Sequence, residues 1–89
     1  MKTKTFIVAA VSANRNNFGL TGMILISGDG EAWQVAANDL NRRPKGTSIT
    51  VPLRHRTPDF SRYGYEIPER LPDAPPAVVS EVTKYLALQ

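Results

Sequence analysis

The segment that most constrains the fold of this chain is Gly28-Asp29-Gly30, which separates two apolar runs, LTGMILIS at 20–27 and EAWQVAA at 31–37. An Asp-Gly pair supplies the two positive φ angles of a type I′ turn, the tight connection preferred between antiparallel strands. The pattern therefore predicts a β-hairpin. With Asp29 and Gly30 as the turn residues, one face carries the expected core side chains Ile24, Ile26, Trp33 and Val35, and the other face carries Met23 and Leu25.

Three further segments have the composition of strands. Residues 4–12 contain the run TFIVAAV, which is rich in β-branched and small residues and predicts a strand covered on both faces. Alternation places Phe6, Val8 and Ala10 on one face of it and Ile7, Ala9 and Val11 on the other. Residues 47–53 alternate in the same way, and residues 63–67 predict a short last strand that ends before Pro68. Gly22 indicates a bulge or bend where the sheet curls.

Between the first two predicted strands, residues 14–19 (NRNNFG) are polar. Asparagine tolerates the left-handed backbone conformation and bonds its own backbone, so the segment predicts a turn of fixed shape. A recognition loop and an exposed apolar anchor through Phe18 are the alternative interpretations. Arg15 is the residue of this segment expected to contact a partner.

The end of the chain predicts one helix. Pro72 precedes it, Asp73 is the expected cap of a helix over residues 74–88, and Pro75 and Pro76 fall in its first turn, where proline is tolerated. Apolar residues then recur at helical spacing, which predicts that the helix packs on the sheet through Val78, Val82, Tyr85 and Leu86.

The 89-residue chain is 42% hydrophobic and 21% charged, which favours one packed domain over a disordered chain. We therefore expect a mainly β fold: a small, curved antiparallel sheet or barrel of four to five strands, SH3-like or OB-like in outline, with one C-terminal α-helix. The sheet is expected within residues 1–68. The proline-rich connection and the helix are expected within residues 69–89.

The composition excludes several kinds of chemistry. The chain has no cysteine and a single histidine, His55, which excludes disulfides, thiolate metal sites and histidine clusters. No P-loop or dinucleotide-binding pattern occurs, and the acidic residues lack the spacing of a carboxylate pair. We therefore expect no enzyme activity and no cofactor. Since no signal peptide or long apolar run is present, the expected location is the cytoplasm, without membrane contact.

Charge is distributed unevenly along the chain. Residues 1–62 hold nine basic and four acidic residues, whereas residues 63–89 hold two basic and four acidic ones. Six of the basic residues lie between positions 42 and 62, where aromatic residues accompany them. Single-stranded nucleic acid requires cations for its phosphates and ring faces for its bases. The candidate nucleic-acid-binding residues are Arg42, Arg43, Lys45, Arg54, Arg56, Arg62, Tyr63 and Tyr65.

These features predict a small, basic, non-catalytic binding module that contacts single-stranded nucleic acid. The alternative is a protein-interaction or homo-oligomerising module, such as a small regulator or inhibitor, that uses a strand edge or the helix surface and has its arginines for solubility. The two interpretations differ in one structural expectation. Nucleic-acid binding requires the 42–46 loop, the 54–62 segment and both tyrosine rings on one exposed face.

Overall fold

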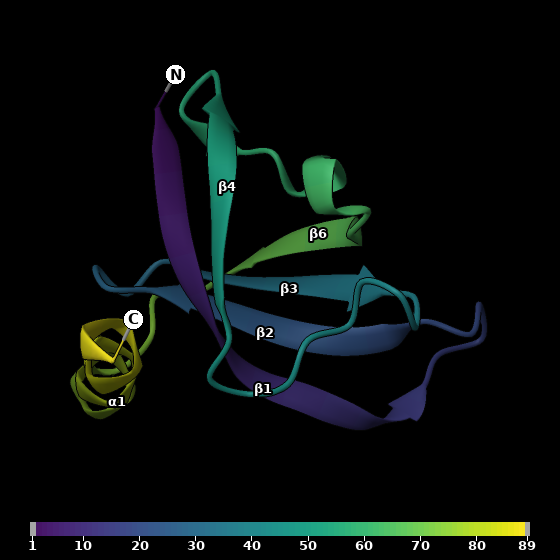
Figure 1. The fold of residues 1–89 in the computed structure, drawn as a ribbon, viewed down its shortest axis with the longest axis horizontal. Coiled ribbons are helices and arrows are strands. Elements are labelled where there is room, and N and C mark those ends of the chain that lie inside the picture. The colour runs from purple at the N-terminus through teal and green to yellow at the C-terminus, as the bar shows by residue number, and fades with distance from the viewer. Residues whose placement is uncertain (1, 89) are drawn as a thin grey trace.

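The computed structural model describes residues 2–88 and consists of one antiparallel sheet, a short 3-10 helix and one α-helix (Figure 1). The strands are β1 (Thr3–Arg15), β2 (Thr21–Ser27), β3 (Ala32–Ala37), β4 (Ser48–Arg54), β5 (Thr57–Pro58) and β6 (Glu66–Leu71). The 3-10 helix η1 spans Phe60–Tyr63, and helix α1 spans Pro76–Ala87.

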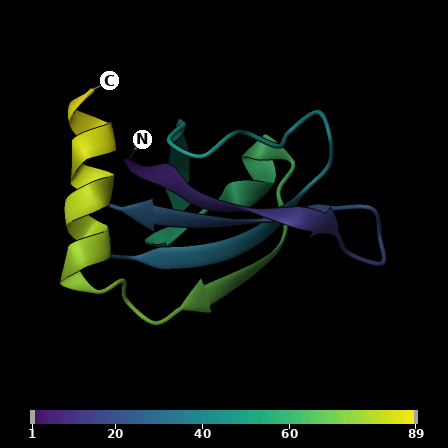
Figure 2. The same cartoon turned by 90° about the horizontal axis from the view of Figure 1, so that it is seen from below.

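The six strands form one sheet in the order β5-β4-β1-β2-β3-β6. The sheet curls into a half-barrel, in which β4 and β6 rise from the two sides of the β1–β2–β3 layer and η1 contacts both of them (Figure 1). Figure 2 shows α1 beside the end of β2 and the start of β3. The expected mainly β fold with a C-terminal helix is confirmed, with six strands instead of four to five.

The curled sheet has a separate hydrophobic core on each face. The inner core lies between the sheet and η1, and its buried residues are Phe6, Val8, Met23, Leu25, Val35, Ala37, Ile49, Val51, Phe60 and Tyr65. The outer core lies between the sheet and α1 and contains the buried residues Ile7, Ile26, Ala32 and Val82. Since neighbouring residues of β1 belong to different cores, the prediction that both faces of this strand are covered is confirmed.

The β2–β3 hairpin forms as predicted, but its turn is not type I′. Gly28-Asp29-Gly30 is a three-residue loop, closed by a hydrogen bond from the Gly30 N–H to the Ser27 carbonyl (3.0 Å). Ser27 N–H in turn donates to the Glu31 carbonyl (3.0 Å). Gly30 has a φ of 91°, which is the conformation that makes glycine the preferred last residue of such a loop.

The longer loop shifts the hairpin register by one residue and changes which side chains share a face. Leu25 pairs with Trp33, where the prediction paired Ile26 with it. The predicted core face of Ile24, Ile26, Trp33 and Val35 is therefore wrong. Trp33 and Val35 pack in the inner core with Met23 and Leu25, whereas Ile24 and Ile26 pack in the outer core.

A bulge in β1 corrects a second assignment. The pairing of β1 with β2 shifts by one residue between Val8 and Ala10. Residues beyond this bulge change faces, so Val11 packs against the inner core that contains Phe6 and Val8, and Ala9 packs against the outer core. Ala10, predicted to share a face with Phe6, is exposed.

The last strand begins at Glu66, because the predicted start at residue 63 lies in η1, and it continues past the predicted end at Pro68. β6 lies at the edge of the sheet. Pro68 has no N–H to donate, but on the solvent side of an edge strand no hydrogen bond to another strand is lost. Its pairing with β3 shifts between Gln34 and Ala36, and Ile67 opposite this shift has a φ of 52°. A β-branched residue is strained in that region, so the regular pairing at both ends of β6 must hold the bulge in place.

Helix α1 begins at Pro76, two residues after the predicted start. The predicted cap is wrong: no side chain caps the helix, and Asp73 instead contacts Arg70 (2.7 Å). The predicted packing of the helix is confirmed. Val82 is buried in the outer core, and the residues packed against that core include Val78, Tyr85 and Leu86.

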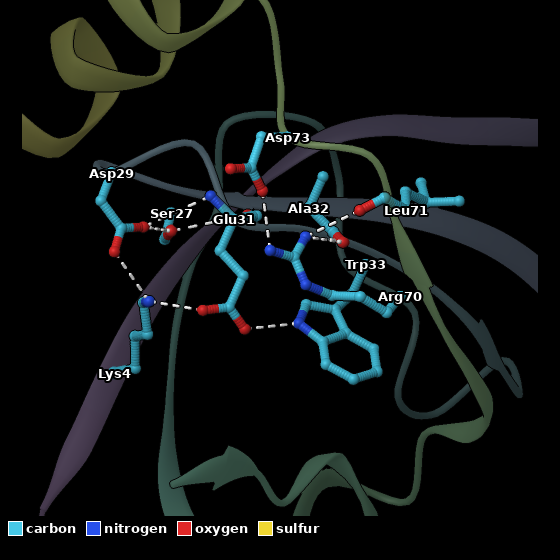
Figure 3. A network of polar contacts seen from close by, with 9 residues as sticks. All are labelled: Lys4, Ser27, Asp29, Glu31, Ala32, Trp33, Arg70, Leu71 and Asp73. Carbon is cyan, nitrogen blue, oxygen red and sulfur yellow. Dashed lines mark hydrogen bonds and ion pairs between the residues drawn. The ribbon is translucent and has the colours of Figure 1, made fainter.

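Polar contacts tie the start of β1 to the β2–β3 loop (Figure 3). Lys4 Nζ donates to Asp29 Oδ2 (2.9 Å) and to Glu31 Oε1 (2.5 Å), and Trp33 Nε1 donates to Glu31 Oε2 (2.6 Å). Burial by itself would lower the pKa of Lys4, but the hydrogen bonds to Glu31 and Asp29 raise it. The ammonium group is therefore held in its charged form between two carboxylates.

Arg70 forms the other half of this network (Figure 3). Its guanidinium donates to the carbonyls of Ala32 (3.1 Å) and Leu71 (2.7 Å) and to Asp73 Oδ1 (2.7 Å). These bonds connect the edge strand β6 to β3 and fix the start of the connection to α1.

A matched pair of phenylalanines tests the inner core. Phe60 is 2% exposed and its ring lies 5.4 Å from the rings of Phe6 and Trp33, whereas Phe18 is 78% exposed. Phe60→Ala should lower the free energy of unfolding by about 3–5 kcal/mol, and Phe18→Ala should change it by less than about 0.5 kcal/mol. Urea unfolding followed by circular dichroism measures both. Equal effects of the two substitutions would contradict the described core.

The acid dependence of stability tests the loop network. Hydrogen bonds from Ser27 and Lys4 lower the pKa of Asp29 to about 2. A carboxyl with a lowered pKa stabilises the fold above its unfolded value and loses this contribution as the pH falls. Asp29→Asn should therefore be destabilising at pH 6, by less than about 1 kcal/mol because the group is exposed, and neutral near pH 2.

Urea unfolding of Asp29→Asn and the parent chain at several pH values gives this difference. The control is the same substitution in a Lys4→Met background, where the difference at pH 6 should shrink. A difference that stays constant from pH 6 to pH 2 would rule out the charged contact as its source.

Candidate functional site

The predicted basic residues fall into two groups at opposite ends of β4. Arg42, Arg43 and Lys45, the loop cations, lie in the connection before β4, and Arg54, Arg56 and Arg62, the tip cations, lie at or beyond its last residue. A strand rises by about 3.3 Å per residue, so the seven residues of β4 span roughly 20 Å between the loop and Arg54. Arg62 instead belongs to η1, whose end also reaches the loop, because a Cβ atom on Gly64 would contact the Asn41 side chain.

The tip cations surround a tight hairpin between β4 and β5. His55 and Arg56 have φ angles of 53° and 66°, as the two turn residues of a type I′ turn require, and both are exposed. Arg62 Nε lies 3.6 Å from Asp59 Oδ2. A hydrogen bond from Ser61, supported by the charges of Arg62 and Arg54, lowers the pKa of Asp59. Part of the positive charge at the tip is thus neutralised locally.

The two tyrosines differ in their environment. Tyr65 is 3% exposed and belongs to the inner core, where burial raises its pKa and the nearby charge of Arg43 acts against this. Tyr63 is 36% exposed, stacks on Tyr65 at 5.7 Å between ring centroids, and donates its hydroxyl to the Thr50 carbonyl (2.6 Å). Only one of the two rings therefore has an accessible surface of any size.

A groove lies beside the second half of β1. β1 pairs with β4 over Thr3–Ile7, and two more backbone bonds follow at Val8, with the Thr47 carbonyl (2.9 Å) and the Gly46 N–H (2.8 Å). Beyond Val8 no strand among residues 2–88 pairs with this side of β1. The chain turns away from the edge at Gly46, whose φ is 92°.

The space beside this free edge has a volume of 670 Å³. Its floor is the stretch Ala9–Val11, and its opposite wall is the connection that carries the loop cations, with Asp39 and Pro44. Figure 2 shows this connection arching over β1 at a distance from the strand. The groove therefore lies where a further strand would continue the line of β4.

Ion pairs bracket the groove at its two ends. Arg15 Nη2 lies 2.9 Å from Asp39 Oδ1, and Lys45 Nζ lies 3.5 Å from Glu81 Oε1, and all four side chains are about half exposed or more. Arg15, the residue of the 14–19 loop expected to contact a partner, thus stands at the far end of this groove. The predicted turn over residues 14–19 is wrong at its start, because Asn14 and Arg15 belong to β1. The rest of the turn has a fixed shape, since Asn16 Oδ1 accepts from the N–H groups of Phe18 (2.9 Å) and Leu20 (3.0 Å).

Arg42 and Arg43 lie between these two ion pairs. Among the described residues, no carboxylate lies within 4.0 Å of either guanidinium. Arg43 Nη1 donates to the carbonyls of Leu40 (2.9 Å) and Arg42 (3.0 Å), which fixes the shape of the connection. The groove therefore combines unpaired backbone on one side with incompletely neutralised positive charge on the other.

The free edge was not anticipated from the sequence. Residues 9–14 (AAVSAN) lack the charges and prolines with which edge strands usually avoid pairing with other chains. The feature that indicates an open edge is the length of β1. It has 13 residues, whereas each of its neighbours, β2 and β4, has seven, so part of β1 extends beyond β4.

Among residues 2–88 no group of three or more histidine, cysteine or acidic side chains has the arrangement of a metal site. Within the same residues, no helix has the length and apolar character needed to cross a membrane. Comparison of the chain with protein-family models, with curated proteins and with solved structures finds no match.

Proposed function

We propose that this chain is a non-catalytic protein-interaction module that binds an extended, acidic segment of a partner protein along the free edge of β1. The observation that carries the proposal is the edge of the second half of β1 that faces away from β2, which has no partner strand among residues 2–88 and borders a groove walled by basic residues. Strand addition to an open sheet edge is a common mode of peptide recognition, in which main-chain hydrogen bonds supply affinity.

The edge has the properties that strand addition requires. Residues Ala9–Arg15 extend over about 20 Å, which matches a peptide of six or seven residues. The small side chains of Ala9, Ala10 and Ala13 leave the backbone of this stretch accessible. The pairing of β1 with β2 shifts between Val8 and Ala10 and again between Val11 and Arg15. Near the second shift Ser12 Oγ bonds the N–H and the carbonyl of Asn14, so the edge that a peptide can pair with is centred on residues 9–13. The hydrogen bonds of Val8 to Gly46 and Thr47 are the last between β1 and the chain that leads into β4. A bound peptide would begin to pair with β1 directly after Val8.

The charge of the groove selects an acidic partner. Arg42 and Arg43 face the space, and Arg15 and Lys45 at its ends are held by Asp39 and Glu81. An incoming carboxylate replaces these weak, exposed ion pairs at little cost, because such pairs contribute about 0–1 kcal/mol each. A second copy of the chain is disfavoured as the partner, since edge-to-edge pairing would bring two basic loops together.

Nucleic-acid binding remains the competing prediction for the same cations. It is weaker for this site because phosphate contacts make no use of an unpaired strand edge, and because the ring of Tyr65 lies in the inner core. The experiment below distinguishes the two partners.

The probe is a fluorescein-labelled seven-residue peptide of alternating glutamate and valine, titrated with the protein and followed by fluorescence anisotropy. The double substitution Arg42→Ala/Arg43→Ala should weaken binding about fivefold to tenfold. The matched control, Arg54→Ala/Arg56→Ala, removes the same charge from the other end of β4 and should change the affinity less than about twofold. Arg42→Lys/Arg43→Lys should retain most of the binding.

Strand addition also predicts that methylation of alternate peptide nitrogens abolishes binding, and that amide signals of residues 9–15 shift on titration. Equal binding of the methylated peptide would reduce the proposal to a charge effect. If a seven-nucleotide single-stranded probe binds more tightly than the peptide, and both double variants weaken it equally, the nucleic-acid interpretation is the better one.

A further inference from the structure

A polar pocket lies at the end of β4, between the last residues of that strand and η1. Its volume is 430 Å³, and it is lined by Pro52, Leu53, Arg54, Asp59, Ser61 and Arg62. We infer that this pocket and the adjoining β4–β5 turn bind a phosphomonoester through its doubly charged phosphate group. The inference concerns the tip cations and does not rest on the proposed peptide site.

Backbone hydrogen bonds fix the walls of the pocket. Asp59 N–H donates to the Pro52 carbonyl (2.9 Å), which holds the chain entering η1 against β4. On the opposite edge of β4, Leu53 N–H donates to the Lys2 carbonyl (2.9 Å), so a further cationic residue lies beside the same end of the strand. Figure 1 shows this end of β4 next to the start of β1 and far from α1.

Positive charge exceeds negative charge in and around the pocket. Within the described part of the chain, neither Arg54 nor Arg56 has a carboxylate within 4.0 Å, and both are exposed. Arg62 is 66% exposed, and its Nε lies 3.6 Å from Asp59 Oδ2, which is too long for a hydrogen bond. Ser61 Oγ donates to the other oxygen of Asp59 (2.5 Å). Three accessible arginines are therefore opposed by one carboxylate.

The backbone of the turn provides a second, independent observation. His55 and Arg56 have φ angles of 53° and 66°, at the two positions where a type I′ turn favours Asn-Gly. Side chains larger than that of asparagine are strained in this region. Both residues are exposed, so no burial offsets the strain. Strain retained at an exposed site points to a use for the side chains themselves.

The chemistry of the site favours phosphate as the anion. A guanidinium presents a planar pair of N–H donors that matches two phosphate oxygens. A phosphomonoester carries about −1.5 to −2 charges at neutral pH, so it compensates three arginines more fully than a carboxylate or a phosphodiester, which carry one charge each. None of the described residues that line the pocket is aromatic, and the neighbouring Phe60 is 2% exposed. A nucleic-acid base would therefore find no ring to stack on.

Methyl phosphate is the probe, and dimethyl phosphate is the matched anion with one charge. In titrations at pH 7 and constant ionic strength, amide and arginine Nε–H signals of residues 52–62 should shift, and those of the loop cations should stay in place. Methyl phosphate should bind about fivefold more tightly than dimethyl phosphate.

Single-charge variants test the assigned residues. Arg54→Gln should weaken methyl phosphate binding about twofold to fivefold. Lys84→Gln removes one charge from α1, far from the pocket, and should change the affinity less than about twofold. Asp59→Asn removes the competing carboxylate and should strengthen binding.

The double substitution His55→Asn/Arg56→Gly separates binding from folding. It introduces the residues that a type I′ turn favours, so the melting temperature should rise by several degrees while methyl phosphate binds more weakly. A stabilised variant that binds methyl phosphate as tightly as the parent chain would refute the role of the turn residues.

Three outcomes would overturn the phosphate site: no shifts with methyl phosphate up to about 20 mM, shifts of equal size at the loop cations, or equal affinity for dimethyl phosphate. A single-stranded oligonucleotide without terminal phosphates contains diesters alone. If it binds at residues 52–62 more tightly than methyl phosphate, the tip is a nucleic-acid contact and the inference is wrong.

Discussion

The pairing of β1 with strands on both of its sides is the constraint on which the rest of this structure depends. Among residues 2–88, β1 is the one strand that bonds both to the β2–β3–β6 half of the sheet and to the β4–β5 half, so it joins the two walls of the half-barrel. Its alternate side chains enter two cores, and a loss of its conformation would separate both at once. Lys4 at its start adds an electrostatic link to the next hairpin. The inner core, the docking of α1 and the free edge all follow from where this strand lies.

The bulge after Val8 divides β1 into two halves that lie in different environments. The first half lies inside the sheet and is buried on both faces at residues 6–8, whereas the second half has solvent beside one edge. A bulge increases local twist and bends the strand, which turns the second half away from the line of β4. The bulge also places Ala9 and Ala10 between α1 and the groove, where both residues line the space on each side. One irregularity of the backbone therefore lies between the groove and the outer core.

The sequence predicts local features well and non-local ones poorly. The β2–β3 hairpin is encoded by Gly28-Asp29-Gly30, but a two-residue turn and a three-residue loop fit the same glycines, so the register predicted from a two-residue turn was wrong by one residue. The apolar spacing of α1 predicted its packing because a helix on a sheet buries one stripe only. Tyr65 could not be assigned, because exposed and core tyrosines share the same local pattern. The free edge depends on where β4 ends relative to β1, and no short segment of sequence specifies that.

The position of α1 has a consequence for how the chain folds as it is synthesised. Helix α1 contacts β1 and β2, which are far earlier in the sequence, and it follows every strand in chain order. Domains acquire structure from the N-terminal side as they leave the ribosome, so the β1–β2–β3 meander can form its local pairs first. Its outer face, with Ile7, Ile24 and Ile26, then remains uncovered until residues 76–87 emerge. During that interval a chaperone, or any apolar surface in the cell, competes with the protein's own helix for this face.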